Sequence, residues 1–70
     1  MSGISFKKIG GAYVADLDYG DERFWLRRIS GRWDLIWQHR NPLGDRMMSR
    51  LGTYTNLAAA KKEAEILAAL

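Results

Sequence analysis

All seven arginines of this 70-residue chain lie between residues 23 and 50. A guanidinium group stays charged and presents a planar fork of donors, which suits it to phosphate and carboxylate groups. With two aspartates in the same stretch, the local charge balance is +5, whereas residues 1–22 carry −2. The middle of the chain is therefore expected to bind an anionic partner. The arginines are Arg23, Arg27, Arg28, Arg32, Arg40, Arg46 and Arg50.

The chain offers few other groups with reactive chemistry. It has no cysteine, and its one histidine, His39, is expected to be a surface or hydrogen-bonding residue. There is no Ser-His-Asp set and no glycine loop for phosphate. The acidic residues of the first third lack the spacing of an EF-hand calcium loop; they are Asp16, Asp18, Asp21 and Glu22. We therefore predict a binding protein that is not an enzyme, with no catalytic residues, metal or cofactor.

Alternating apolar and polar residues, bounded by glycine, proline and asparagine, predict a series of β-strands. We expect these strands over residues 5–9, 12–18, 23–29, 32–39 and 46–54. Turns are predicted at Gly10-Gly11, Tyr19-Gly20-Asp21 and Ser30-Gly31, with a longer loop over residues 40–45. An alanine-rich helix then begins after an N-cap at Thr55 or Asn56.

Length and composition allow one domain over residues 1–70, with a core of residues 12–70 and residues 1–11 as an N-terminal strand or arm. The predicted fold class is α+β: an antiparallel β-sheet of three to five strands, in meander order, packed on one C-terminal α-helix. Alternation places Trp33, Leu35 and Trp37 on the helix side of the sheet. Because so small a core needs large side chains, all three tryptophans, Trp25 included, are expected to pack inside it.

The strand over residues 23–29 has apolar groups on both sides. Phe24, Leu26 and Arg28 share one side, and Trp25, Arg27 and Ile29 share the other. Two arrangements remain open: the N-terminal strands cover the outer side of the sheet, or that side stays exposed.

Residues 22–68 resemble the AP2-type DNA-binding domain and the related N-terminal arm-binding domains of phage-type tyrosine integrases. The likeness is carried by Gly31-Arg32-Trp33, a loop with Asn41-Pro42 and Gly44, a strand ending in Leu51-Gly52-Thr53-Tyr54, and the alanine-rich helix. In those families the sheet face opposite the helix lies in the major groove. The resemblance implies a small DNA-binding module of phage or mobile-element type. The residues that it implies for DNA binding are Arg23, Arg28, Arg32, Gln38, Arg50 and Thr53.

Two alternatives accompany this prediction. The element order is also similar to single-strand-binding folds of the transcriptional-coactivator and Whirly type, although duplex DNA is favoured here over single-stranded DNA. In the second alternative the chain is a protein-interaction factor, either a homodimer or a binder of a host or phage protein. It would use an apolar patch with an arginine rim, formed by Leu26, Ile36, Met47 and Met48.

No segment has the pattern of a signal peptide or approaches the roughly 20 apolar residues of a membrane helix. We therefore expect no membrane partner. The expected location is the cytoplasm of a bacterial cell, for a protein encoded by the bacterium or by a phage.

Overall fold

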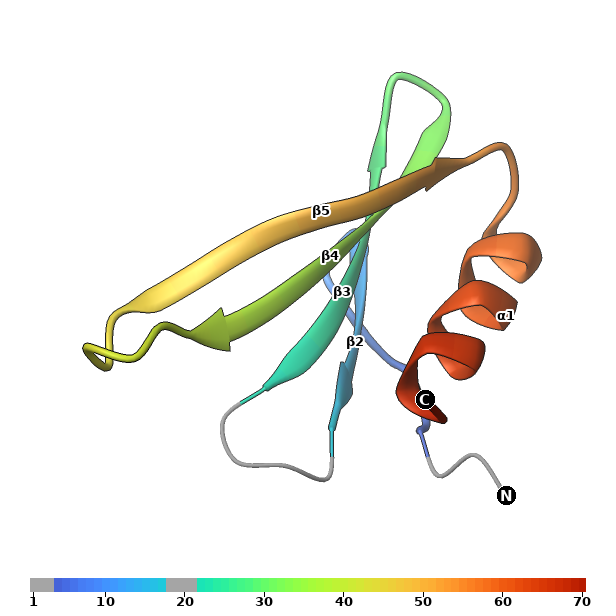
Figure 1. Ribbon diagram of the computed structural model, residues 1–70. Coiled ribbons are helices and arrows are strands. Elements are labelled where there is room, and N and C mark those ends of the chain that lie inside the picture. Colours follow the sequence, from blue (N-terminus) through green and yellow to red (C-terminus); the bar gives the residue numbers. More distant parts are fainter. Residues whose placement is uncertain (1–3, 18–21) are drawn as a thin grey trace.

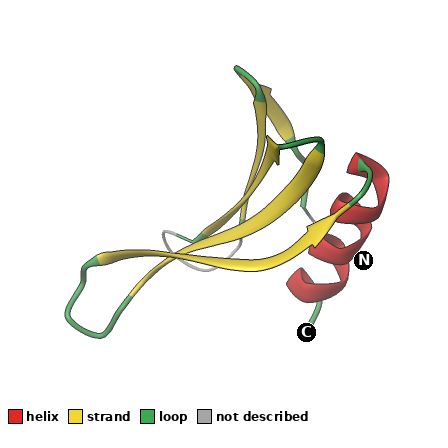
Figure 2. Ribbon diagram, turned by 90° about the horizontal axis from the view of Figure 1, so that it is seen from above, coloured by secondary structure: helices red, strands yellow, loops and turns green. Residues whose placement is uncertain are grey.

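The computed structural model describes residues 4–17 and 22–70. Five antiparallel strands follow one another across a single sheet in the order β1-β2-β3-β4-β5, and a C-terminal helix lies against one face (Figures 1 and 2). This α+β meander confirms the predicted fold class. The elements are β1 (Lys7–Ile9), β2 (Ala12–Asp16), β3 (Arg23–Ile29), β4 (Arg32–Arg40), β5 (Arg46–Tyr54) and α1 (Leu57–Ala68).

Local turn chemistry sets the pairing of the strands. Ser30 and Gly31 both have positive φ angles, 52° and 76°, as a two-residue type I′ hairpin turn requires. The turn brings Ile29 opposite Arg32. In the β4–β5 loop, Oδ1 of Asn41 accepts hydrogen bonds from the backbone N–H groups two and four residues later, at 3.0 and 2.9 Å. The turn predicted at Tyr19-Gly20-Asp21 lies outside the described residues.

The helix begins at a side-chain cap. Oδ1 of Asn56 accepts from the backbone N–H of Ala59 at 2.7 Å, so Asn56, rather than Thr55, is the N-cap. The buried side of α1 is formed by Ala60 and Ala64, whose small side chains let the helix approach the sheet.

The centre of the core lies beneath the helix. Leu26 of β3 and Leu35 of β4 are cross-strand partners on the helix side of the sheet, and both are completely buried. Trp33 and Trp37 pack around this cluster on the helix side, as predicted. Trp25 does not. Trp25 is instead half-buried on the opposite face, because it is the direct neighbour of Leu26 and successive residues of a strand point to opposite faces.

The N-terminal strands extend the sheet instead of covering it. β1 pairs with β2, and β2 pairs with β3, so both lie beside the remaining strands at one edge. Phe6 and Tyr13 pack against the core, and the ammonium group of Lys61 lies 4.8 Å from the ring centroid of Tyr13. Within the described residues, the sheet face opposite α1 therefore stays open.

Candidate functional site

We name the sheet face opposite α1 the arginine face. Cross-strand pairing places on it every second residue of each strand, in continuous rows. One row contains Val14, Trp25, Ile36 and Arg50, and the next contains Ala12, Arg27, Asp34 and Thr53. Six of the seven arginines belong to this face: Arg23, Arg27, Arg32, Arg40, Arg46 and Arg50.

Positive charge dominates the arginine face. Lys7 of β1 lies opposite Val14 and adds a seventh cation. Among the strand residues that the structure describes on this face, the acidic ones are Asp16 and Asp34. Most of the cations of the chain therefore lie on one side of the sheet, where they outnumber the anions and produce a positive potential.

Five of the six residues implied for DNA binding come together on this face: Arg23, Arg32, Gln38, Arg50 and Thr53. The placement of Arg28 there is wrong. Arg28 pairs with Trp33, which packs against the core on the helix side. Strand alternation gives the outward position to its neighbour Arg27, a residue that the resemblance did not supply.

Arg50 and Thr53 share a face because β5 contains a bulge. They are three residues apart, so regular alternation would separate them. Gly52 pairs with Leu35 and Arg50 pairs with Ile36, which leaves Leu51 without a cross-strand partner. The extra residue turns Arg46, Met48 and Arg50 onto the arginine face. A glycine within a strand, here Gly52, is the sequence signal for such a bulge.

Asp34 is the buried anion of the arginine face, with 7% of its surface exposed. Its Oδ1 accepts a hydrogen bond from the hydroxyl of Thr53 at 2.9 Å. Nη1 of Arg50 lies 3.8 Å from its Oδ2, while the Arg50 side chain remains 68% exposed. At the sheet edge, Nε of Arg23 lies 3.3 Å from the exposed Asp16 carboxylate. Asp34 therefore orients Arg50 without removing it from solvent.

A shallow hollow of about 260 Å³ crosses the arginine face diagonally from β2 to β5. Within it, the indole Nε1 of Trp25 donates a hydrogen bond to Oε1 of Gln38 at 3.0 Å. The hollow combines apolar walls with guanidinium groups; its lining residues are Ala12, Trp25, Arg27, Gln38, Arg46 and Met48.

The apolar patch that was predicted for a protein partner contains different residues in the structure. Leu26 is completely buried under the helix and cannot contribute. Met47 pairs with His39 and lies on the helix side, whereas Met48 pairs with Gln38 on the arginine face. The apolar groups that remain at the centre of the arginine face are Trp25, Ile36 and Met48.

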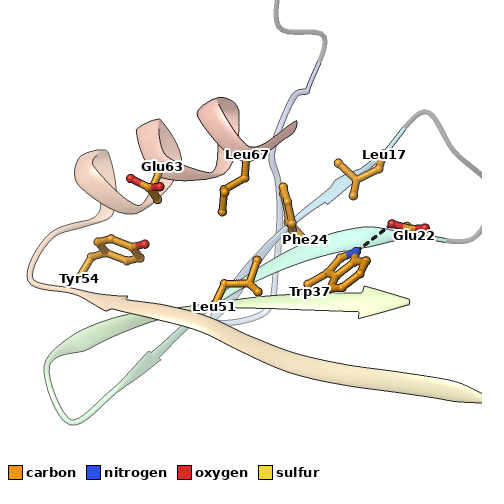
Figure 3. A pocket seen from close by; sticks show the side chains of 8 residues that line it. All are labelled: Leu17, Glu22, Phe24, Trp37, Leu51, Tyr54, Glu63 and Leu67. Atoms are coloured by element: carbon orange, nitrogen blue, oxygen red, sulfur yellow. Dashed lines mark hydrogen bonds between the residues drawn. The ribbon is translucent and has the colours of Figure 1, made fainter. Parts of the chain in front are cut away.

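A second hollow, of about 350 Å³, lies between the sheet and α1 (Figure 3). Apolar and aromatic side chains form most of it, and Nε1 of Trp37 donates to Oε1 of Glu22 at 2.9 Å. Tyr54 projects into the same space opposite Glu63 (Figure 3). Burial, and secondarily the charge of Glu63, raise the pKa of the Tyr54 hydroxyl above its ordinary value of 10.0. This hollow contains two carboxylates, those of Glu22 and Glu63, and lies on the helix side of the sheet.

His39 has a structural environment. Its ring stacks on Trp37 with the centroids 3.8 Å apart, and its Nε2 is hydrogen-bonded to Oγ of Ser49 at 3.1 Å.

Across residues 4–17 and 22–70, no three acidic, histidine or cysteine side chains gather as a metal site would need. No helix in the same residues is long and apolar enough to cross a membrane.

Comparisons with known protein families, with curated proteins and with solved structures found no match to this chain. The arginine face combines a row-by-row array of cations with two side chains, Gln38 and Thr53, that can hydrogen-bond neutral polar groups. Such a surface is suited to a polyanion that also carries polar edges.

Proposed function

We propose that the protein is a DNA-binding module that places its arginine face on duplex DNA. The observation that carries this proposal is that six of the seven arginines share the sheet face that the helix leaves open. Arginine-phosphate contacts release condensed counterions and supply sequence-independent affinity. The activity proposed is binding, without a catalytic step.

The shape of the sheet supports a groove-binding mode. The β4–β5 hairpin projects well beyond α1 and carries Arg40 and Arg46 next to its loop (Figure 1). A two-stranded β-ribbon fits the major groove of B-DNA, which is about 12 Å wide. From Arg32 to Arg40, β4 spans roughly 26 Å at about 3.3 Å per residue, enough to follow several base pairs.

The same arrangement agrees with the resemblance to AP2-type and integrase arm-binding domains. In those families the sheet face opposite the helix enters the major groove, and here β3, β4 and β5 provide such a face while α1 packs behind them. We extend the proposal to a phage or mobile-element module on that basis. Arg27 takes the role that the resemblance assigned to Arg28, because of these two neighbours in β3 it is Arg27 that lies on the arginine face.

Fluorescence anisotropy with duplex and single-stranded DNA at two salt concentrations tests the proposal. We expect tighter binding to the duplex, with an affinity that falls by about 0.9 logarithmic units per logarithmic unit of salt for each phosphate contacted. Arg27→Glu and Arg28→Glu form a matched pair, since the two residues are neighbours on opposite faces. Arg27→Glu should weaken binding roughly tenfold and reduce the salt slope, and Arg28→Glu should have a much smaller effect.

Equal losses for the two variants would show that the arginine face is not the contact surface. Salt-insensitive binding, or no binding to any nucleic acid, would refute the DNA-binding function. Circular dichroism of each variant confirms that the sheet is intact.

A second candidate function is a protein-interaction factor that uses the same face. The exposed Met48, at 52% exposure, lies near Trp25 and Ile36 within an arginine rim, as in many interfaces. Light scattering would then give the mass of a homodimer, and Met48→Asp would return it to that of a monomer. A monomer that binds duplex DNA would favour the first candidate.

A further inference from the structure

Gln38 on the arginine face is fixed as a hydrogen-bond donor. The indole N–H of Trp25 can only donate, so the atom of Gln38 that it contacts at 3.0 Å must be the carbonyl oxygen, Oε1. This identifies the orientation of the amide on chemical grounds. Within the described residues, the amide nitrogen Nε2 makes no hydrogen bond of its own. The amide therefore presents an unpaired –NH₂ to a ligand, whereas one of the two lone pairs of Oε1 is already used by Trp25.

The surroundings of this donor are apolar. Trp25 lines the hollow on one side of Gln38 and Met48 lines it on the other. Arg27 and Arg46 lie towards opposite ends of the hollow. A ligand that enters here meets one directed donor, an apolar surface beside it, and cations on both flanks.

Resting on the proposed function, we infer that this hollow reads thymine in the major groove. Thymine presents its O4 acceptor next to its C5 methyl group. The O4 atom would accept from Nε2 of Gln38, and the methyl group would contact Trp25 and Met48. Arg27 and Arg46 would bind flanking phosphates or neighbouring bases.

The orientation of Gln38 also disfavours other bases. A freely rotating glutamine recognises adenine through both its oxygen and its nitrogen. Here Oε1 already accepts from Trp25, which uses one of its two lone pairs and holds the oxygen towards the indole. The N6 group of adenine and the N4 group of cytosine are donors and would face another donor. Adenine also offers its N7 acceptor to Nε2, but it has no methyl group for the apolar wall. Guanine offers acceptors to Nε2 but no methyl group for the apolar wall.

Selection from a pool of randomised duplexes, followed by competition binding, tests this inference. The selected site should contain a thymine whose replacement by deoxyuridine weakens binding about fourfold, the effect of removing one buried methyl group. Replacement by 5-methylcytosine, which keeps the methyl but turns the acceptor into a donor, should weaken binding more. Neither change alters the protein.

Two variants assign the effect to this hollow. Gln38→Glu presents only acceptors, so the preference at this position should move from thymine to cytosine. Trp25→Phe keeps an apolar ring but removes the N–H, which frees the amide to turn and should allow adenine. Both variants should keep the salt slope of the unmodified protein to within about one phosphate contact.

The outcomes separate the two proposals. Absence of binding to any duplex would overturn the DNA-binding function and this inference together. Salt-dependent duplex binding without a thymine preference, or with one that Gln38→Glu and deoxyuridine leave unchanged, would overturn the thymine site alone.

Discussion

The two faces of the sheet are held in different ways. On the helix side, close packing fixes the positions of the side chains. Four of them are completely buried: Leu26, Leu35, Ala60 and Ala64. On the arginine face, side chains are positioned by polar contacts, from Thr53 to Asp34 and from Trp25 to Gln38. The helix side therefore holds the closely packed core, whereas the arginine face stays open.

The tryptophans show the same difference at the scale of single residues. Trp37 and Trp25 are both half-buried, and each indole N–H has a side-chain acceptor. On the helix side that acceptor is the carboxylate of Glu22, beside the core. On the arginine face it is the neutral amide of Gln38, which keeps an outward-facing donor. The hydrogen bond of Trp25 thus orients a surface side chain, whereas that of Trp37 joins two residues at the edge of the core.

The largest expected effect comes from adjacent residues of β4 on opposite faces. Leu35→Ala should lower the free energy of unfolding by about 2–5 kcal/mol, because it leaves a cavity between the sheet and α1. Ile36→Ala, on the half-buried arginine face, should lower it by roughly 1 kcal/mol. Urea unfolding followed by tryptophan fluorescence measures both, and the milder Leu35→Val serves if Leu35→Ala is unfolded in water. Similar losses at the two positions would contradict the assignment of the core to one face.

A smaller effect is expected at Gly52, where the bulge of β5 meets the core. A Cβ atom added there would lie 2.6 Å from the hydroxyl oxygen of Tyr54 and 3.0 Å from its ring. Gly52→Ala should therefore displace the ring and lower the free energy of unfolding by about 1–2 kcal/mol. Tyr54→Leu in the Gly52→Ala background should recover part of this loss, since it removes the clash. Thermal unfolding of the two single variants and the double variant measures this coupling.

The contrast between the faces also explains which features the sequence predicts. Periodicity and turn residues predicted the meander, the Ser30-Gly31 turn and the helix start, because these depend on local backbone preference and burial. Alternation within β3 already placed Arg27 and Arg28 on opposite sides, and the structure agrees with that pattern rather than with the family resemblance.

Other features depend on contacts between distant residues. The bulge at Leu51 and the Trp25–Gln38 hydrogen bond both require the register between strands, which no local pattern supplies. The choice between an open and a covered outer face was likewise decided by where β1 and β2 pair. A face that is not needed for burial leaves a weaker signal in the sequence than one that is.

Asp34→Asn tests the polar contacts of the arginine face. The change removes a buried negative charge but keeps an acceptor for Thr53. Release of Arg50 should raise duplex affinity about two- to fivefold, corresponding to about 0.5–1 kcal/mol, while stability falls by about 1 kcal/mol. Asp16→Asn is the matched control, because it frees Arg23 at the exposed sheet edge and should leave stability unchanged. Anisotropy and urea unfolding measure the two effects, and a fall in duplex affinity for Asp34→Asn would contradict the electrostatic role of this face.

The smallest expected effect concerns Tyr54 in the hollow behind the sheet. Its pKa is raised in the folded protein, first by burial and then by the charge of Glu63. The folded state therefore holds this proton more tightly than the unfolded chain. The resulting stabilisation is fully present below the unfolded pKa, about 10, and is lost as the pH rises through the higher folded value.

When the pH is raised from about 9 to about 11, the free energy of unfolding should consequently fall less for Tyr54→Phe than for the unmodified protein. Near neutral pH, the free energy of unfolding of either protein should change little with pH. Glu63→Gln removes only the lesser cause, so its alkaline loss should lie between those of the other two proteins. Urea unfolding at a series of pH values distinguishes the three. If Glu63→Gln matched Tyr54→Phe, the charge of Glu63 rather than burial would dominate, and the hollow behind the sheet would be more open to water than the packing of Tyr54 over Gly52 implies.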